Sequence, residues 1–108
     1  MKNKHYRQGD VLLERISKMP SDLKKLARED KKIILAHGEV TGHAHAIIEE
    51  NCDLFSSETE AGVTFLEVRE AMAALTHEEH GRIDLAPGNY RVRRQREYSP
   101  QAIRNVAD

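Results

Sequence analysis

The sequence has no tryptophan, a single cysteine and no long apolar run. The lone cysteine, Cys52, excludes an internal disulfide. The longest apolar runs, such as Ile33–Ala36, are far shorter than the roughly 18 residues that a membrane-spanning helix needs. The amino-terminal residues also lack the apolar segment of a signal peptide. These absences predict a soluble, cytoplasmic protein.

The chain also lacks an excess of charge of either sign. Its 17 Lys and Arg residues nearly balance its 18 Asp and Glu residues, which gives a formal net charge of −1. This balance argues against a protein that binds polyanions over its whole surface. A chain of 108 residues is long enough for one hydrophobic core. We therefore expect residues 1–108 to form a single domain.

Short runs of apolar and β-branched residues between turn residues favour a mainly β fold. The expected strands are Val11–Ile16, Lys32–His37, His43–Glu49, Gly62–Val68, Ala71–Leu75, Arg82–Leu85 and Tyr90–Tyr98. A short internal helix is expected over residues 22–29, where Leu23, Leu26 and Ala27 share one face. A second short helix is expected at the C-terminus, over residues 101–107. The pattern predicts a small single-domain β-sandwich or β-barrel.

Five of the six histidines fall into two tight groups. The first group is His37, His43 and His45, and the second is His77 and His80. If the two strands around the first group pair as a hairpin, His37 lies opposite His43, and His45 shares the face of His43. Three imidazoles on a divalent ion leave a coordination position open for water or substrate. We therefore expect His37, His43 and His45 to bind a divalent transition metal, which would be Zn, Mn, Fe, Ni or Cu.

His77 and His80 lie between two expected strands. They are candidates for a fourth ligand, a second metal or a general base, and we assign them as catalytic residues. The alternative for these two is a solvated loop, and the alternative for the His-x-His pair is a set of exposed or hydrogen-bonded structural histidines. Small neighbours such as Gly42 and Gly81 favour a site, because they let a ligand approach the backbone.

The last expected strand places Tyr90, Val92, Arg94 and Arg96 on one face. If Val92 points into the core, Arg94 and Arg96 lie near the mouth of the fold and require an anionic partner. We therefore assign Tyr90, Arg94 and Arg96 to the binding of a small anionic substrate, phosphorylated or nucleotide-like. The alternatives are a charged edge strand that resists aggregation and a surface that binds nucleic acid or a protein partner.

One segment resembles the first metal-binding motif of the cupin superfamily. Gly38, then the sequence His-Ala-His at residues 43–45, then Glu49 or Glu50, is similar to that motif. The resemblance implies a small jelly-roll barrel with His43, His45 and one of the two glutamates as metal ligands. The residues by themselves nominate His37 in place of the glutamate, and both ligand sets stay open.

A second segment, residues 81–88, is similar to the Gly and Pro-Gly skeleton of the second cupin motif. The histidine that should follow is replaced by the region of Tyr90 and Arg91. If the resemblance holds, His37 or His80 takes the role of the missing histidine.

These features predict a metal-dependent enzyme, and a hydrolase in which metal-activated water attacks an anionic substrate is the specific expectation. An oxygenase or an isomerase would use the same ligands. Two other classes are a non-enzymatic module that binds nucleic acid or a protein partner through the arginine-rich strand, and a metal-sensing or accessory protein without turnover. We expect a homodimer, because a small β fold leaves strand edges that can pair.

Overall fold

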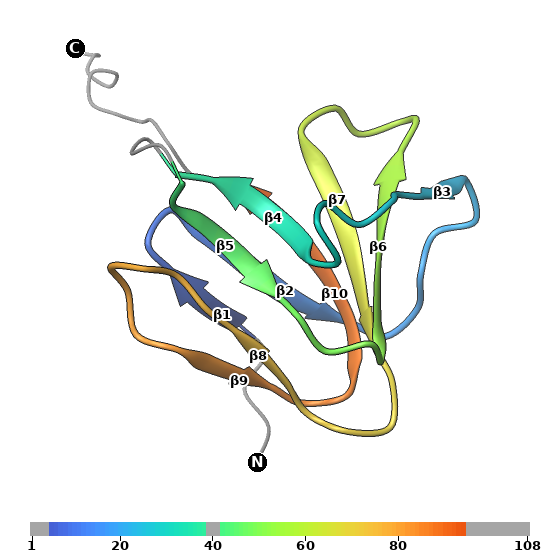
Figure 1. Cartoon of the computed structure of the whole chain (residues 1–108). Helices are drawn as coiled ribbons and strands as arrows, with labels where there is room; N and C mark the ends of the chain where they lie inside the picture. Colours follow the sequence, from blue (N-terminus) through green and yellow to red (C-terminus); the bar gives the residue numbers. More distant parts are fainter. Residues whose placement is uncertain (1–4, 39–41, 95–108) are drawn as a thin grey trace, which may run out of the picture.

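The computed structural model describes residues 5–38 and 42–94, which form ten β-strands (Figure 1). The strands are β1 (His5–Gln8), β2 (Val11–Ile16), β3 (Leu23–Lys25), β4 (Ile33–His37), β5 (Ala44–Ile47), β6 (Cys52–Ser57), β7 (Val63–Val68), β8 (Ala73–Leu75), β9 (Ile83–Leu85) and β10 (Gly88–Arg94). The expectation of a mainly β protein is confirmed. None of the described residues belongs to a helix that is long and apolar enough to cross a membrane.

Six strands form an antiparallel sheet in the order β1-β2-β10-β7-β6-β3. Strand β10 lies in its middle, between β2 and β7, so the interpretation of this segment as an edge strand is wrong. Its alternation arises because one face is buried and the other is solvated. Tyr90 and Val92 face the core, whereas Arg91 pairs with Glu60 at 2.6 Å.

Two hairpins, β4–β5 and β8–β9, lie in front of this sheet in Figure 1. They are joined by a bridge in which the backbone N–H of Ala46 donates to the carbonyl of Thr76 at 3.0 Å, and the N–H of Thr76 donates back at 2.9 Å. The six-stranded sheet stays open at β1 and β3. Across the part of the chain that the structure describes, hydrogen bonding therefore closes no barrel.

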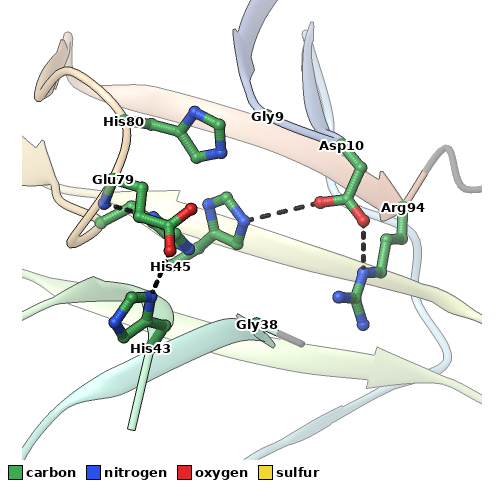
Figure 2. A pocket seen from close by; sticks show the side chains of 9 residues that line it. Gly9, Asp10, Gly38, His43, His45, Glu79, His80 and Arg94 are labelled. Carbon is green, nitrogen blue, oxygen red and sulfur yellow. Dashed lines mark hydrogen bonds and ion pairs between the residues drawn. The ribbon is translucent and has the colours of Figure 1, made fainter. Parts of the chain in front are cut away.

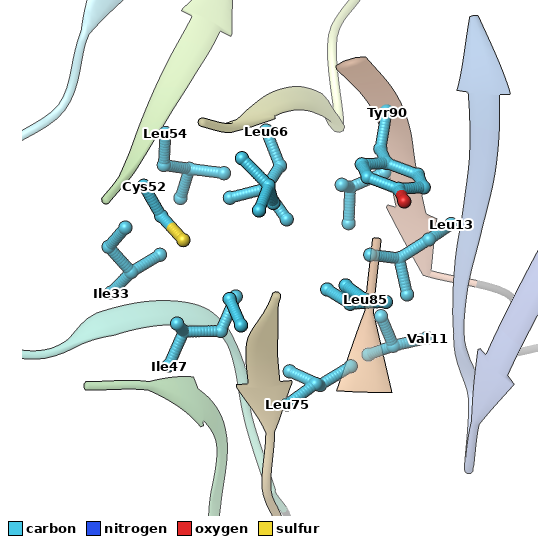
Figure 3. Packing of buried hydrophobic residues seen from close by; sticks show 13 residues of the cluster. Val11, Leu13, Ile33, Ile47, Cys52, Leu54, Leu66, Leu75, Leu85 and Tyr90 are labelled. Atoms are coloured by element: carbon cyan, nitrogen blue, oxygen red, sulfur yellow. The ribbon is translucent and has the colours of Figure 1, made fainter. Parts of the chain in front are cut away.

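The hydrophobic core fills the space between the hairpins and the sheet (Figure 3). Ile33, Ile47 and Leu75 come from the hairpins, and Leu13 and Leu66 come from the sheet. Because side chains alternate along a strand, Val11 and Leu13 on β2 point inward together, as do Leu66 and Val68 on β7. One core thus holds both layers together.

Tyr90 lies at the end of this core and has no exposed surface. Its hydroxyl donates a hydrogen bond to the carbonyl of Ala86 at 2.6 Å, and its ring meets the ring of Tyr6 edge-on at 5.7 Å. Such a tyrosine supports the packing of β10 against β1 and β2.

The internal helix expected over residues 22–29 is wrong, because Leu23–Lys25 forms β3 and pairs with β6. The N–H of Leu26 continues this pairing by donating to the carbonyl of Leu54 at 2.8 Å. A two-turn helix is marginal by itself, so tertiary pairing overrides the helical pattern of the leucines. The expected C-terminal helix and the end of the last expected strand lie outside the described residues.

Cys52 is fully buried in the core. Burial, together with the charge of nearby Glu49, raises the pKa of its thiol to about 11. Only the thiolate reacts, so we expect a thiol-specific disulfide reagent at pH 8 to modify the native protein at least about 100-fold more slowly than the urea-unfolded chain. Equal rates in the two states would show that β6 opens freely.

Candidate functional site

Two histidines of the first group, His43 and His45, meet both histidines of the second group in space. The ring of His45 lies 4.3 Å from the ring of His77 and 5.9 Å from that of His80, measured between ring centroids. The ring of His43 lies 5.9 Å from that of His77. These four side chains line a pocket of about 350 Å³, which we call the histidine pocket (Figure 2).

The remaining charged groups of the histidine pocket are Asp10, Glu79 and Arg94. They come from three separate places: the turn between β1 and β2, the loop between β8 and β9, and the end of β10. Two carboxylates and one guanidinium thus surround four imidazoles. The volume of the histidine pocket lies at the lower end of the range for small-molecule sites, about 300–1,000 Å³.

The loop between β8 and β9 contacts β5 and the residue before it through two acidic side chains. The backbone N–H of Ala44 donates to Oε1 of Glu78 at 2.9 Å, and this hydrogen bond holds the pKa of Glu78 below its ordinary value. Oε2 of Glu79 lies 2.9 Å from Nδ1 of His43. The His-Glu-Glu-His sequence therefore supplies both the ring neighbours of His45 and the contacts that hold them there.

The position of His37 differs from the expected one because of strand register. His37 pairs with Ala44 rather than with His43, and the N–H of Gly38 donates to the carbonyl of His43. A shift of one residue moves a side chain to the opposite face. The side chain of His37 is therefore exposed and contacts Glu29 at 3.1 Å, away from the histidine pocket.

The hydrogen bonds of Gln8 determine which ring nitrogen of His45 carries the hydrogen. Nε2 of Gln8 donates to the carbonyls of Leu75 and Gly81, each at 2.9 Å, so its Oε1 is an acceptor that faces Nδ1 of His45 at 2.8 Å. That nitrogen must carry the hydrogen. Burial, with the charge of His77 nearby, lowers the pKa of His45 to about 4. His45 is thus neutral at pH 7, and its Nε2 holds an unshared electron pair.

Asp10 faces that electron pair, with Oδ1 at 3.5 Å from Nε2 of His45 (Figure 2). Burial alone would raise the pKa of Asp10, but the hydrogen bond and the charge of Arg94 outweigh it and lower the pKa. Nε of Arg94 donates to Oδ2 of Asp10 at 2.8 Å, and its Nη2 donates to the carbonyl of His37 at 2.7 Å. An ionised carboxylate and a lone pair therefore lie side by side.

His77 carries its proton on the opposite nitrogen. The backbone N–H of Glu79 donates to Nδ1 of His77 at 3.0 Å. A nitrogen that accepts a hydrogen bond has no hydrogen, so neutral His77 is protonated on Nε2. His77 therefore presents an N–H group beside His45, which presents a lone pair.

The three residues assigned to substrate binding lie in different parts of the chain's structure or outside its described residues. Arg94 lines the histidine pocket. Tyr90 is enclosed in the core and supports the fold instead. Arg96 lies outside the described residues.

Sequence reasoning missed Gln8, Asp10 and Glu79. The pair Gly9-Asp10 forms the two-residue turn between β1 and β2, where Gly9 has a φ of +58°. A Cβ on Gly9 would lie 2.6 Å from Nε2 of His80, so any larger residue here would displace the His80 ring from the turn. The turn was readable in the sequence, but its contact with residues some 70 positions away was not.

The donor atoms are not converged on one point. Within residues 5–38 and 42–94, no three His, Cys, Asp or Glu side chains are placed at the distances that hold a metal ion. Nδ1 of His43 is nevertheless buried and lies outside hydrogen-bond geometry, despite its short distance to Glu79. A buried, unsatisfied imidazole nitrogen fits a cation that this nitrogen and the carboxylate would share.

Fold and pocket define a small, mainly β protein with a four-histidine pocket between its layers. The chain belongs to the family described as a domain of unknown function (DUF8820), whose model matches residues 7–95. The matched segment includes every side chain of the histidine pocket. No curated protein and no solved structure matches the chain.

We expect Gln8→Leu to destabilise the protein by roughly 2–4 kcal/mol, because it removes the donor to the carbonyls of Leu75 and Gly81 and leaves the buried Nδ1 of His45 unsatisfied. Urea unfolding measures this change. The matched control is Asn51→Leu, which also removes an amide that donates to two carbonyls, those of Arg69 and Ala71. Only Gln8→Leu should shift the ring signals of His45, and identical spectra for both variants would contradict this role of Gln8.

The protonation of the two rings is directly measurable. In long-range ¹H–¹⁵N correlation spectra at pH 7.5, we expect His45 to appear as the tautomer protonated on Nδ1. Neutral His77 should appear as the tautomer protonated on Nε2, because its Nδ1 accepts the N–H of Glu79. The same tautomer for both rings would show that one of the two hydrogen bonds is absent in solution.

Proposed function

We propose that the histidine pocket binds a divalent transition metal and that the protein is a metal-dependent enzyme for a small anionic substrate. The observation that carries the proposal is the fixed lone pair on Nε2 of His45, 3.5 Å from the ionised carboxylate of Asp10. Two electron-rich atoms at this distance repel each other, and a cation that lies beside both would remove the repulsion. Two ligands bound to one ion at 2.0–2.1 Å are about 3.0–3.4 Å apart, which is close to this separation.

The way in which Gln8 holds His45 also supports the proposal. A histidine that binds a metal donates its other ring N–H to an acceptor, which fixes the tautomer and the orientation of the ring. Gln8 is such an acceptor, and it is itself held by two backbone carbonyls. This arrangement prepares Nε2 of His45 as a ligand.

Beside His45, the candidate ligands are Asp10, His43, His80 and Glu79. His77 fits a different role, because its Nδ1 accepts a backbone N–H and its Nε2 carries the proton. The choice of His80 and Glu79 over His37 replaces the ligand set expected from the sequence. A bound transition metal would supply Lewis-acid activation of water or of a substrate oxygen.

We favour hydrolysis, because a bound metal would supply an activated water as the nucleophile beside a guanidinium that suits an anionic substrate. Arg94 suits the binding of an anionic group, since its hydrogen bonds to Asp10 and to the carbonyl of His37 use Nε and Nη2, and its Nη1 can donate to a carboxylate or phosphate. His77 would donate its N–H to the same substrate. Oxygenase or isomerase chemistry on the same ligands is the neighbouring possibility within this proposal.

A cupin-like origin of the site is part of the proposal. His43 and His45 line the pocket from β5 and its preceding residue, and His80 precedes the segment that resembles the second cupin motif. His80 rather than His37 therefore suits the place of the missing histidine. Neither Glu49 nor Glu50 lines the histidine pocket, and Asp10 and Glu79 provide the carboxylates there.

Elemental analysis tests the proposal. The protein is purified without a tag or chelator and reconstituted with Zn, Mn, Fe, Ni or Cu, and we expect about one ion per chain for at least one metal. Metal-loaded protein is then assayed with p-nitrophenyl phosphate, a general phosphate ester, with a chelator-treated sample as the control. The absence of bound metal under every condition would overturn the proposal, whereas one ion without turnover would reduce it to metal binding.

A further inference from the structure

A second cavity of about 350 Å³ lies beside the histidine pocket, at the same end of the two layers. Its walls are mostly apolar and include Val11, Leu35, Ala36 and Val92, with Thr64, Arg93 and Arg94 as the polar lining residues. They come from β2, β7 and β10 of the sheet and from β4 of the covering hairpin. We call this space the apolar cavity.

Arg94 lines both the apolar cavity and the histidine pocket. Its guanidinium is held at the boundary by Asp10 and by the carbonyl of His37. Two consecutive residues also lie on different sides of this boundary: Asp10 lines the histidine pocket, and Val11 lines the apolar cavity. The two spaces therefore adjoin each other across one arginine.

Strand β4, which forms one wall of the apolar cavity, is irregular in its pairing with β5. The pairing of β4 with β5 shifts between Ile34 and Ala36, which is a β-bulge at Leu35. Bulges bend a strand and are frequent next to binding sites. Here the bulge lies where Leu35 and Ala36 border the apolar cavity.

The charges of the histidine pocket specify which ligand group it would accept, and Arg93 adds a further positive charge at the apolar cavity. With neutral histidines, the carboxylates of Asp10 and Glu79 and the guanidinium of Arg94 sum to −1, and a divalent ion would change the sum to +1. A metal-loaded pocket would then attract an anion, whereas the adjoining walls suit hydrocarbon. Inorganic phosphate alone would leave the apolar cavity unused.

We propose that the substrate is a small amphipathic anion. Its carboxylate or phosphate head lies in the histidine pocket near Arg94, and its alkyl or aryl group lies in the apolar cavity. This inference rests on the proposed function and adds the substrate class to it.

The test is calorimetric titration of zinc-loaded protein with acetate, butanoate, hexanoate and octanoate. We expect the affinity to rise about fourfold for each methylene that enters the apolar cavity, until the cavity is full. Hexan-1-ol, which lacks the charge, should bind at least about tenfold more weakly than hexanoate. An affinity independent of chain length in protein that holds one zinc would overturn this inference and leave the metal site standing.

Two variants with the same substitution, alanine to isoleucine, test where the alkyl group of the ligand lies. Ala36→Ile fills part of the apolar cavity, and we expect it to weaken octanoate at least about tenfold while acetate is unaffected. Ala74→Ile is the matched control, since Ala74 lies on β8 and lines neither space. Equal effects of the two variants on octanoate would also overturn the inference.

Metal-free protein separates this inference from the function on which it rests. If no metal binds but affinity still rises with chain length and falls in Ala36→Ile, the metal proposal fails and the apolar cavity keeps its assigned ligand group. If one zinc binds and the chain-length effect is absent, only the substrate class fails.

Discussion

Replacing His45 with alanine is expected to weaken zinc binding at least about 100-fold. Loss of a residue that merely orients a metal ligand costs about 10- to 100-fold in metal affinity, and His45 is the ligand whose lone pair the fold prepares most completely. Competition with a chelating dye measures the zinc affinity. The fold must be checked in parallel, because the variant leaves Oε1 of Gln8 without its partner.

His37→Ala is the matched control for this experiment. His37 also belongs to the first histidine group, but its side chain is exposed and contacts Glu29. We expect zinc affinity and stoichiometry to stay at the wild-type level. Wild-type affinity in His45→Ala, or a large loss in His37→Ala, would show that the metal is bound elsewhere.

The contrast between His45 and His37 shows how far spacing in the sequence can locate a site. Alternation along a strand correctly grouped Tyr90, Val92 and Arg94, because it depends only on strand geometry. The place of His37 depended on which residues pair across the hairpin. The shift between Ile34 and Ala36 decides that pairing, and nothing in the local sequence announces it.

The meeting of the two histidine groups depended on tertiary structure. It requires the β8–β9 hairpin to dock on β5 through the Ala46–Thr76 bridge and through Glu78. Composition could single out residues 77–80 as unusual, but only docking distinguishes a solvated loop from one wall of a pocket.

The same limit applies to the β1–β2 turn. Gly9 and Asp10 gave a readable turn signal, yet their function in the fold comes from contact with His80 and His45. Turn residues are chosen by local backbone geometry, so the sequence offers a sufficient local reason for both. The second reason appears only when the β8–β9 loop lies against the turn.

The internal helix failed for a related reason. The leucine spacing in residues 22–29 was compatible with one helical face, but the segment is too short to be stable as an isolated helix. The open edge of β6 offers it three paired residues instead, Leu23–Lys25. Where local preference is weak, the available partner decides the structure.

Acidification is expected to remove on the order of 3 kcal/mol of stability through His45 in the metal-free protein. Burial and the charge of His77 lower the pKa of His45 from its ordinary value of 6.5 to about 4 in the folded state. The unfolded chain therefore binds more protons than the folded chain between these values. The contribution is complete above about pH 6.5 and is lost as the pH falls toward 4.

Urea unfolding with a chelator present, from pH 4 to pH 8, measures this loss. His45→Gln is the reference, because glutamine does not titrate and carries an amide that can face Gln8. Acid weakens both proteins through their carboxylates, so the informative quantity is the difference between the two unfolding free energies. The stability advantage of the wild type over the variant should shrink between pH 7 and pH 4, by the amount that the lowered pKa of His45 dictates. Parallel curves would mean that His45 is not held neutral, and the lone pair proposed as the first metal ligand would lose its physical basis.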